Sequence, residues 1–136
     1  MDIIEFFKQD RYAAFTGIEL LEAGDGKALA KLEIKEMHLN GVNTVQGGAL
    51  FTLADLAFAA AANSHGTVAV SLNSFISFIN SATAGTTVFA KAGEVSVHKK
   101  VAVYHIDITK EDGTLIATYE GTAFRKDIEL PFKKES

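Results

Sequence analysis

Cysteine and tryptophan are absent from this 136-residue chain, and proline occurs once. Without cysteine the protein has no disulfide framework, no thiol nucleophile and no thiolate ligand for a metal. The absence is compatible with a reducing compartment, and we expect a cytoplasmic protein. The four histidines follow no metal-binding spacing, so we also expect no metal site.

Positive charge and long apolar runs are also scarce. The chain has 13 Lys and Arg against 17 Asp and Glu, a net charge of −4, which leaves no basic footprint for a nucleic acid. The longest weakly polar run, residues 47–62, contains Thr52 and Asp55 and falls short of the ~20 residues that a membrane span requires. The first residues lack the basic start and apolar core of a signal peptide. We therefore expect a soluble protein that binds neither nucleic acid nor membrane.

A hydrophobic content of 48% in 136 residues suits one compact domain, which we place at residues 1–136. Near-helical spacing of apolar residues predicts a short helix over residues 3–12, and alternation around Gly24-Asp25-Gly26 predicts a β-hairpin. After a loop at 35–46, residues 47–63 are apolar nearly all round, which is typical of a buried helix. Strands are predicted at 68–78, 87–98, 101–110 and 114–125, and the charged tail from Asp127 is expected to fray.

This order of elements indicates the α+β class. An antiparallel sheet that must cover a helix apolar on all sides has to curl around it. A single curled sheet leaves open edges, which proteins commonly manage by pairing with a second copy. We therefore expect a homodimer, and the pattern leaves open whether two dimers associate into a tetramer.

Asp55 is the least expected residue of the long helix, because Ala54 and Leu56 flank it and no Lys or Arg occurs in residues 47–63. Burying a carboxylate among apolar neighbours costs several kcal/mol unless the group is paired or faces a wet cleft. Two interpretations are open at this point. Asp55 is either a structural carboxylate that reaches solvent or caps other amides, or a catalytic group whose pKa is raised by burial.

Gly47 and Gly48 stand where this helix begins. A helix N-terminus presents unpaired amides and a positive dipole end, which suit an anion or a developing oxyanion, and glycine lets a carbonyl approach the backbone closely. Asp55 lies eight residues beyond Gly47, about 12 Å along the helix. One carbonyl cannot comfortably contact both groups of one chain. An amide from one subunit and a carboxylate from the other would converge in a dimer with shared sites.

The run from His38 to Asp55, HLNGVNTVQGGALFTLAD, resembles the hotdog-fold thioesterases of the phenylacetate-pathway (PaaI) type. Their pattern is an Asn, then His-Gly-Gly, then an Asp eight residues past the first Gly, and the order of strands fits their fold over nearly the whole chain. The resemblance implies a hotdog fold, in which a curled antiparallel sheet wraps one long central helix. It also implies an acyl-CoA thioesterase, which hydrolyses a thioester to a free acid and coenzyme A.

The same resemblance assigns roles to individual residues. It implies that the Gly47 amide polarises the thioester carbonyl, and that Asp55 of the opposite subunit acts as nucleophile or as general base on water. Asn40 would orient the water or the carboxylate, and Ser71 would assist near the same site, with Gln46 at the family's histidine position. The residues expected to bind substrate are Gly48, Asn73, Phe75, His98, Lys99 and Lys100.

Two of these substrate contacts have a more specific basis. Phe75 is expected to share a strand face with Ser71 and Asn73 and to line an acyl pocket. The corner His98-Lys99-Lys100 is expected to meet the phosphates of coenzyme A, and its alternative is an ordinary solvated turn. No separate cofactor is expected, because coenzyme A is part of the substrate. The acyl group, whether aryl, short or longer, is left open.

The chain departs from the family pattern at Gln46, where histidine is usual, and also at Asn43 and Ser81. Glutamine donates and accepts hydrogen bonds but cannot titrate. This departure favours an alternative function, a non-catalytic hotdog protein that binds acyl-CoA without hydrolysing it. Hotdog dehydratases, a third class, use a catalytic His or Glu near the helix start, and neither residue occupies that position here.

Overall fold

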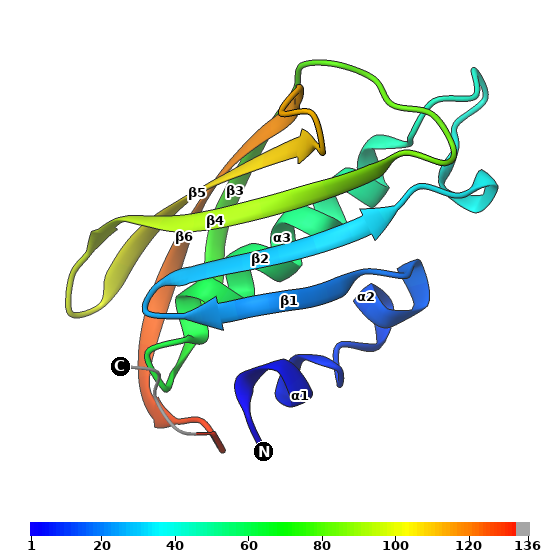
Figure 1. Cartoon of the computed structure of the whole chain (residues 1–136). Helices are drawn as coiled ribbons and strands as arrows, with labels where there is room; N and C mark the ends of the chain where they lie inside the picture. The colour runs from blue at the N-terminus through cyan, green and yellow to red at the C-terminus, as the bar shows by residue number, and fades with distance from the viewer. Residues whose placement is uncertain (133–136) are drawn as a thin grey trace.

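The computed structural model describes residues 1–132 and shows a six-stranded sheet wrapped around one long helix (Figure 1). The α+β class is therefore confirmed. The helical elements are α1 (Ile3–Phe7), α2 (Arg11–Thr16), the 3-10 turn η1 (Glu36–His38) and α3 (Gly47–Asn63). The strands are β1 (Glu19–Gly24), β2 (Lys27–Glu33), β3 (Thr67–Phe78), β4 (Thr87–Val97), β5 (Val101–Lys110) and β6 (Leu115–Glu129).

The sheet is antiparallel throughout, with the strand order β1-β2-β4-β5-β6-β3. The chain leaves the sheet after β2, crosses one face as α3, and enters the far edge as β3 before β4 returns to pair with β2 (Figure 1). This crossing places α3 against the concave face, in contact with every strand of the sheet. Strand β3 is left at an open edge.

Helix α3 forms the centre of the hydrophobic core. Its alanines and leucines are good helix formers, and Ala54, Ala57 and Ala60 are completely buried. Small side chains let the helix lie close to the sheet, where Leu32 and Ile106 pack against it with 1% and 0% of their surface exposed. No helix within the described part of the chain is long and apolar enough to cross a membrane.

The prediction of one N-terminal helix over residues 3–12 is wrong, because the segment forms two helices. Asp2 caps α1 by accepting a hydrogen bond from the Glu5 amide at 2.8 Å. Asp10 does the same for α2, accepting from the Ala13 amide at 3.1 Å. A side-chain oxygen that binds the first free amides favours a new helix start. Asp10 therefore begins α2 rather than continuing α1.

The prediction that the chain frays from Asp127 is also wrong for the residues that are described. Strand β6 continues to Glu129, which pairs with Thr67 at the start of β3. The Leu130 amide then donates to the Gly66 carbonyl at 2.9 Å. The long β3 edge supplies these backbone partners, and charge on the side chains does not prevent strand pairing. Residues 133–136 of the predicted tail lie outside the described residues.

The open edge of β3 carries several exposed apolar side chains. Leu72 and Phe75 expose 56% and 71% of their surface. A long apolar edge strand with unpaired backbone groups is a template for another chain. The edge that the dimer prediction requires is therefore present, and the oligomeric state itself stays a prediction.

Replacing Gly121 of β6 with alanine should destabilise the fold. A Cβ at this position meets the Phe58 ring of α3 at 2.9 Å, so the ring or the helix has to shift. Overpacking of this kind costs roughly 1–3 kcal/mol. The matched control is Gly93→Ala in β4, where, apart from the adjoining residues, no heavy atom of the described chain lies within 4 Å of the new Cβ. Urea denaturation should show a lower midpoint for Gly121→Ala alone, and equal midpoints for the two variants would contradict this packing.

Candidate active site

Asp55 lies half-buried in the middle of α3, facing strand β6. The Tyr119 hydroxyl of β6 donates a hydrogen bond to Asp55 Oδ1 at 3.1 Å. Tyr119 itself is 1% exposed. Among residues 1–132, no cation forms an ion pair with this carboxylate. The structure therefore holds Asp55 through a neutral hydroxyl, and its charge has no counter-ion in the described part of the chain.

The surroundings raise the pKa of Asp55 above its ordinary value, as its apolar neighbours in the sequence predict. Burial is the largest cause, because a desolvated carboxylate favours its neutral form. The hydrogen bond from Tyr119 lowers the pKa in part, and the negative charge of Asp10 at the start of α2 raises it again. The result is a carboxylate that is a stronger base than an exposed aspartate.

A row of hydroxyl groups extends from Tyr119 away from Asp55. The Ser74 Oγ lies 2.6 Å from the Tyr119 hydroxyl oxygen, and the Ser71 Oγ lies 3.4 Å from Ser74 Oγ. Burial raises the pKa of Tyr119, so its hydroxyl keeps the proton that it donates to Asp55. A phenol has only one such proton, and Ser74 is therefore the donor to Tyr119. Ser71, predicted to lie near the site, stands at the outer end of this row.

A bulge in β3 brings the two serines to the same face of the sheet. Ser71 pairs with Ala123 and Asn73 with Thr122, so Leu72 is an extra residue between them. An extra residue reverses the alternation of side chains. The prediction that Ser71, Asn73 and Phe75 share one face is therefore wrong.

Asn73 and Phe75 lie on the opposite face from Asp55. Phe75 pairs with Glu120 and, like Asn73, is exposed, whereas the intervening Ser74 faces Tyr119. The two residues line no acyl pocket with Asp55 of the same chain. Their contact with substrate stays a prediction that needs another subunit.

Gln46 acts as the N-terminal cap of α3. Its side-chain Oε1 accepts a hydrogen bond from the Gly48 amide at 2.6 Å, and its backbone carbonyl accepts one from the Ala49 amide at 3.0 Å. A Cβ on Gly48 would lie 2.5 Å from that Oε1, so the Gln46 side chain would have to shift from its capping position. The Gly48 amide is consequently occupied within its own chain.

The Gly47 amide, in contrast, has no hydrogen-bond acceptor among residues 1–132. The Phe78 ring packs over Gly47, where a Cβ would meet the ring at 2.8 Å. Gly47 therefore presents one free N–H at the positive end of the helix, beside a half-exposed aromatic ring. Asp55 lies eight residues further along the same helix, about 12 Å by helix rise. One chain alone does not bring the two groups together.

Asn40 stabilises the loop that precedes this helix. Its Oδ1 accepts hydrogen bonds from the amides of Val42 at 3.0 Å and Thr44 at 3.1 Å, and its Nδ2 donates to Thr44 Oγ1. Asn43 in this loop has a φ of 64°, a conformation that asparagine tolerates better than most residues. Within one chain Asn40 shapes the approach to α3 and touches neither Asp55 nor Gly47. Its predicted role in orienting water stays a prediction.

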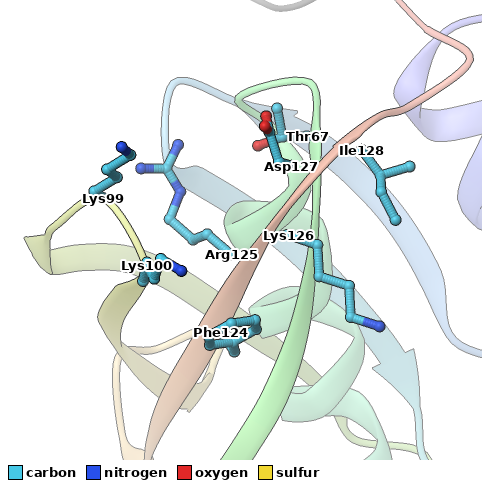
Figure 2. A pocket seen from close by; sticks show the side chains of 8 residues that line it. All are labelled: Thr67, Lys99, Lys100, Phe124, Arg125, Lys126, Asp127 and Ile128. Atoms are coloured by element: carbon cyan, nitrogen blue, oxygen red, sulfur yellow. The ribbon is translucent and has the colours of Figure 1, made fainter.

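Lys99 and Lys100 line a groove of about 670 Å³ at the β4–β5 turn (Figure 2). The groove also contains Arg125 and Lys126 from the far end of β6. Figure 2 shows the Arg125 side chain extending from β6 toward this turn, where its guanidinium donates to the His98 carbonyl at 3.1 Å. Sequence reasoning did not single out Arg125 and Lys126. The available signal was the pairing of the last two strands around the Glu111-Asp112-Gly113 turn, which sets Val101 opposite Phe124 and Arg125 beside Lys100. His98 contributes its backbone but is not part of the groove lining.

Comparison with known proteins places this geometry in a family. Residues 42–117, which include Gly47, Asp55 and both serines, match the family model of the thioesterase superfamily. The chain belongs to the thioesterase superfamily. It is 34% identical to the acyl-coenzyme A thioesterase PaaI of Escherichia coli, in a match that covers 88% of this chain and 85% of that protein.

Solved structures support the same assignment for the fold. The E. coli PaaI protein superposes with a TM-score of 0.88 at 32% identity, covering 92% of this chain and 91% of that one. A mutant of the phenylacetic acid degradation protein PaaI from Thermus thermophilus superposes with a TM-score of 0.83 at 35% identity, covering 86% of this chain and 100% of that one. The predicted hotdog fold is therefore confirmed. As a thioesterase, the chain is a thioester hydrolase.

The variant Asp55→Asn should be more stable than the wild type at neutral pH. The pKa of Asp55 is higher in the folded state than in the unfolded chain. The stability that the protonated carboxyl contributes is therefore complete at pH values below the ordinary pKa of aspartate, and it is lost as the pH rises through the folded-state pKa. Asparagine removes that loss and still accepts the Tyr119 hydrogen bond. Urea midpoints should differ at about pH 7 and converge at about pH 3. A difference between the two urea midpoints that does not change with pH would contradict this account.

Proposed function

We propose that this thioesterase hydrolyses acyl-CoA thioesters with aryl or short- to medium-chain acyl groups, releasing the free acid and coenzyme A. The observation that carries the proposal is the presence, on one helix, of a free Gly47 amide and an Asp55 carboxylate without a counter-ion among the described residues. The first group suits a developing oxyanion and the second suits proton abstraction or attack. The similarity to the acyl-coenzyme A thioesterase PaaI of E. coli supports the choice of thioester.

The proposed reaction uses these groups in a defined order. The thioester carbonyl oxygen binds the Gly47 amide, and Asp55 takes a proton from water as the water oxygen bonds to the carbonyl carbon. The tetrahedral intermediate then expels the coenzyme A thiolate, which takes up the proton that Asp55 holds. Direct attack by Asp55, with an acyl-enzyme anhydride that water hydrolyses, is the second route. An oxyanion donor contributes roughly 10²–10³ in rate and a positioned base roughly 10²–10⁴. No separate cofactor takes part in either route.

The separation of Gly47 and Asp55 leads us to propose that a dimer forms each active site. The two groups lie about 12 Å apart along one rigid helix, whereas a reacting carbonyl needs both at contact distance. Two copies that pair through the open β3 edge would let Gly47 of one subunit face Asp55 of the other. The exposed Leu72 and Phe75 of β3 supply apolar surface for such contacts.

We assign the basic groove of Figure 2 to the phosphates of coenzyme A. Lys99, Lys100 and Arg125 lie together on its lining, against one anion, Asp127, and the side chain of a fourth cationic lining residue, Lys126, extends to the other side of β6 (Figure 2). Strand β6 connects this groove to the catalytic carboxylate, since Tyr119 lies six residues before Arg125, about 20 Å by strand rise. A ligand with a phosphorylated end and a long flexible arm fits that separation.

The alternative function, acyl-CoA binding without hydrolysis, depends on the departure at Gln46. The structure explains Gln46 as a helix cap whose oxygen binds Gly48, and a cap does not need to titrate. We therefore prefer the catalytic proposal and treat binding without turnover as an outcome of the test below.

Wild-type protein should release free thiol from a panel of phenylacetyl-, benzoyl- and medium-chain acyl-CoA thioesters. Asp55→Ala should abolish turnover, and Gly47→Pro should lower kcat roughly 10²–10³-fold, because proline removes the N–H group. Proline is well tolerated at the first position of a helix, and the preceding Gln46 has the extended conformation, ψ 137°, that proline requires. Gly47→Ala is the matched control, since it also places a Cβ against Phe78 but keeps the amide. Calorimetric binding without thiol release would favour the non-catalytic alternative.

Mixing the two inactive variants should restore activity if the sites are shared. A dimer of one Asp55→Ala chain and one Gly47→Pro chain has one doubly altered site and one intact site. Random pairing of equal amounts then gives about a quarter of the wild-type activity. Light scattering should show a particle of at least twice the 14.6 kDa chain mass. A mixture no more active than the separate variants, or a monomer in solution, would contradict shared sites.

A further inference from the structure

The hydrogen bond from Tyr119 to Asp55 has no part in the reaction steps proposed for the thioesterase. Asp55 has two carboxylate oxygens, and Oδ1 is occupied by the Tyr119 hydroxyl at 3.1 Å. Tyr119 lies in β6, outside the segment 42–117 that matches the family model. The hydrogen bond to Asp55 therefore comes from a strand, β6, and not from the helix α3 that carries Asp55.

We propose that Tyr119 is a positioning residue, which holds the Asp55 carboxylate through Oδ1 and leaves Oδ2 as the oxygen that reacts. The proposal rests on the proposed function, because it assumes that Asp55 performs the chemistry. It adds a named atom for proton abstraction or attack, and a second element, β6, that sets the direction of the carboxylate.

The Tyr119 ring is held rigidly enough to aim its hydroxyl. It is 1% exposed and packs edge-on against Phe51, with ring centroids 5.4 Å apart, and tilted against Phe58 at 5.8 Å. Both phenylalanines belong to α3, one turn to either side of Asp55. The helix that carries the carboxylate thus also holds the ring that binds it. A donor fixed in this way loses little conformational freedom when the reactive geometry forms.

The row of serines orients the Tyr119 proton. Ser74 Oγ lies 2.6 Å from the Tyr119 oxygen and donates to it, so the tyrosine proton points to Asp55. Ser71 Oγ, 3.4 Å from Ser74, continues the row to an exposed position on β3. The bulge at Leu72 is what places both serines on this face. The direction of the carboxylate therefore depends on β3 as well as on β6.

The hydrogen bond has a further effect on the charge of Asp55. It stabilises the ionised carboxylate and so opposes the rise in pKa that burial causes. Two titratable groups act on Asp55 from the elements packed around it within the described residues, Tyr119 of β6 and Asp10 at the start of α2. Without the Tyr119 hydroxyl, burial and Asp10 both favour the protonated, inactive acid.

The test compares Tyr119→Phe with Tyr104→Phe by following kcat and KM against pH. Tyr104 is the matched control, because it is also 1% exposed and packs against Phe58 at 5.7 Å, but its hydroxyl donates to Glu94 at 3.3 Å. Tyr119→Phe should lower kcat roughly 10- to 100-fold with KM within about 3-fold, since it disturbs orientation and not binding. The acid limb of the kcat–pH profile should move to higher pH in Tyr119→Phe. In Tyr104→Phe this limb should stay at the wild-type position.

Two further measurements separate positioning from folding and from the proposed function. Ser74→Ala should shift the acid limb in the same direction by a smaller amount, and circular dichroism should show all three variants folded. A ¹³C NMR titration of the Asp55 carboxyl should report a higher pKa in Tyr119→Phe even if no thioester is turned over. A wild-type acid limb and an unchanged Asp55 titration in Tyr119→Phe would overturn the proposal. Absence of turnover in the wild type would instead overturn the proposed function alone.

Discussion

A helix that is apolar on nearly every side has to be covered on nearly every side, and a single sheet covers it only by curling. Helix α3 imposes this requirement here, with Ala54, Ala57 and Ala60 completely buried against the concave face. The crossing of the chain from β2 to β3 follows from it, because α3 has to traverse the sheet before the last strands can close over it. An open β3 edge remains, because this six-stranded sheet curls around the helix without closing on itself, with β1 and β3 at its two ends.

The same burial determines the chemistry of the site. A carboxylate in this helix loses water, so its pKa rises, and the hydroxyl of Tyr119 offsets only part of the loss. A nearby lysine or arginine would stabilise the fold more but would hold Asp55 ionised and weakly basic. The free N–H of Gly47 shows the same compromise at the start of the helix, where a fully capped end would be more stable and chemically inert. In the proposed mechanism, both features exchange stability of the fold for reactivity of the site.

Most of the framework could be predicted from the sequence because it depends on local periodicity and on turn residues. The hairpin around Gly24-Asp25-Gly26 and the bounds of α3 are examples, and the hotdog resemblance rested on Asn40, Gly47 and Asp55 at a fixed spacing. The errors arose where one residue acts against its neighbours' pattern, as Asp10 does by starting a new helix and Leu72 by shifting the strand alternation. Tyr119 was missed for a different reason. Its partner lies 64 residues away, and no spacing along the chain reveals a contact between a helix and the last strand.

The glutamine cap of α3 has a consequence for how the enzyme responds to acidity. A histidine at the helix start would gain a positive charge in acid and change the field around the carbonyl-binding amide. Gln46 carries no charge at any pH, and its amide oxygen accepts the hydrogen bond from the Gly48 amide whatever the pH. The helix end that is proposed to bind the carbonyl therefore has a cap that does not titrate. In the proposed mechanism, protons therefore regulate the enzyme at one end of the site only, through the Asp55 carboxylate that the other subunit supplies.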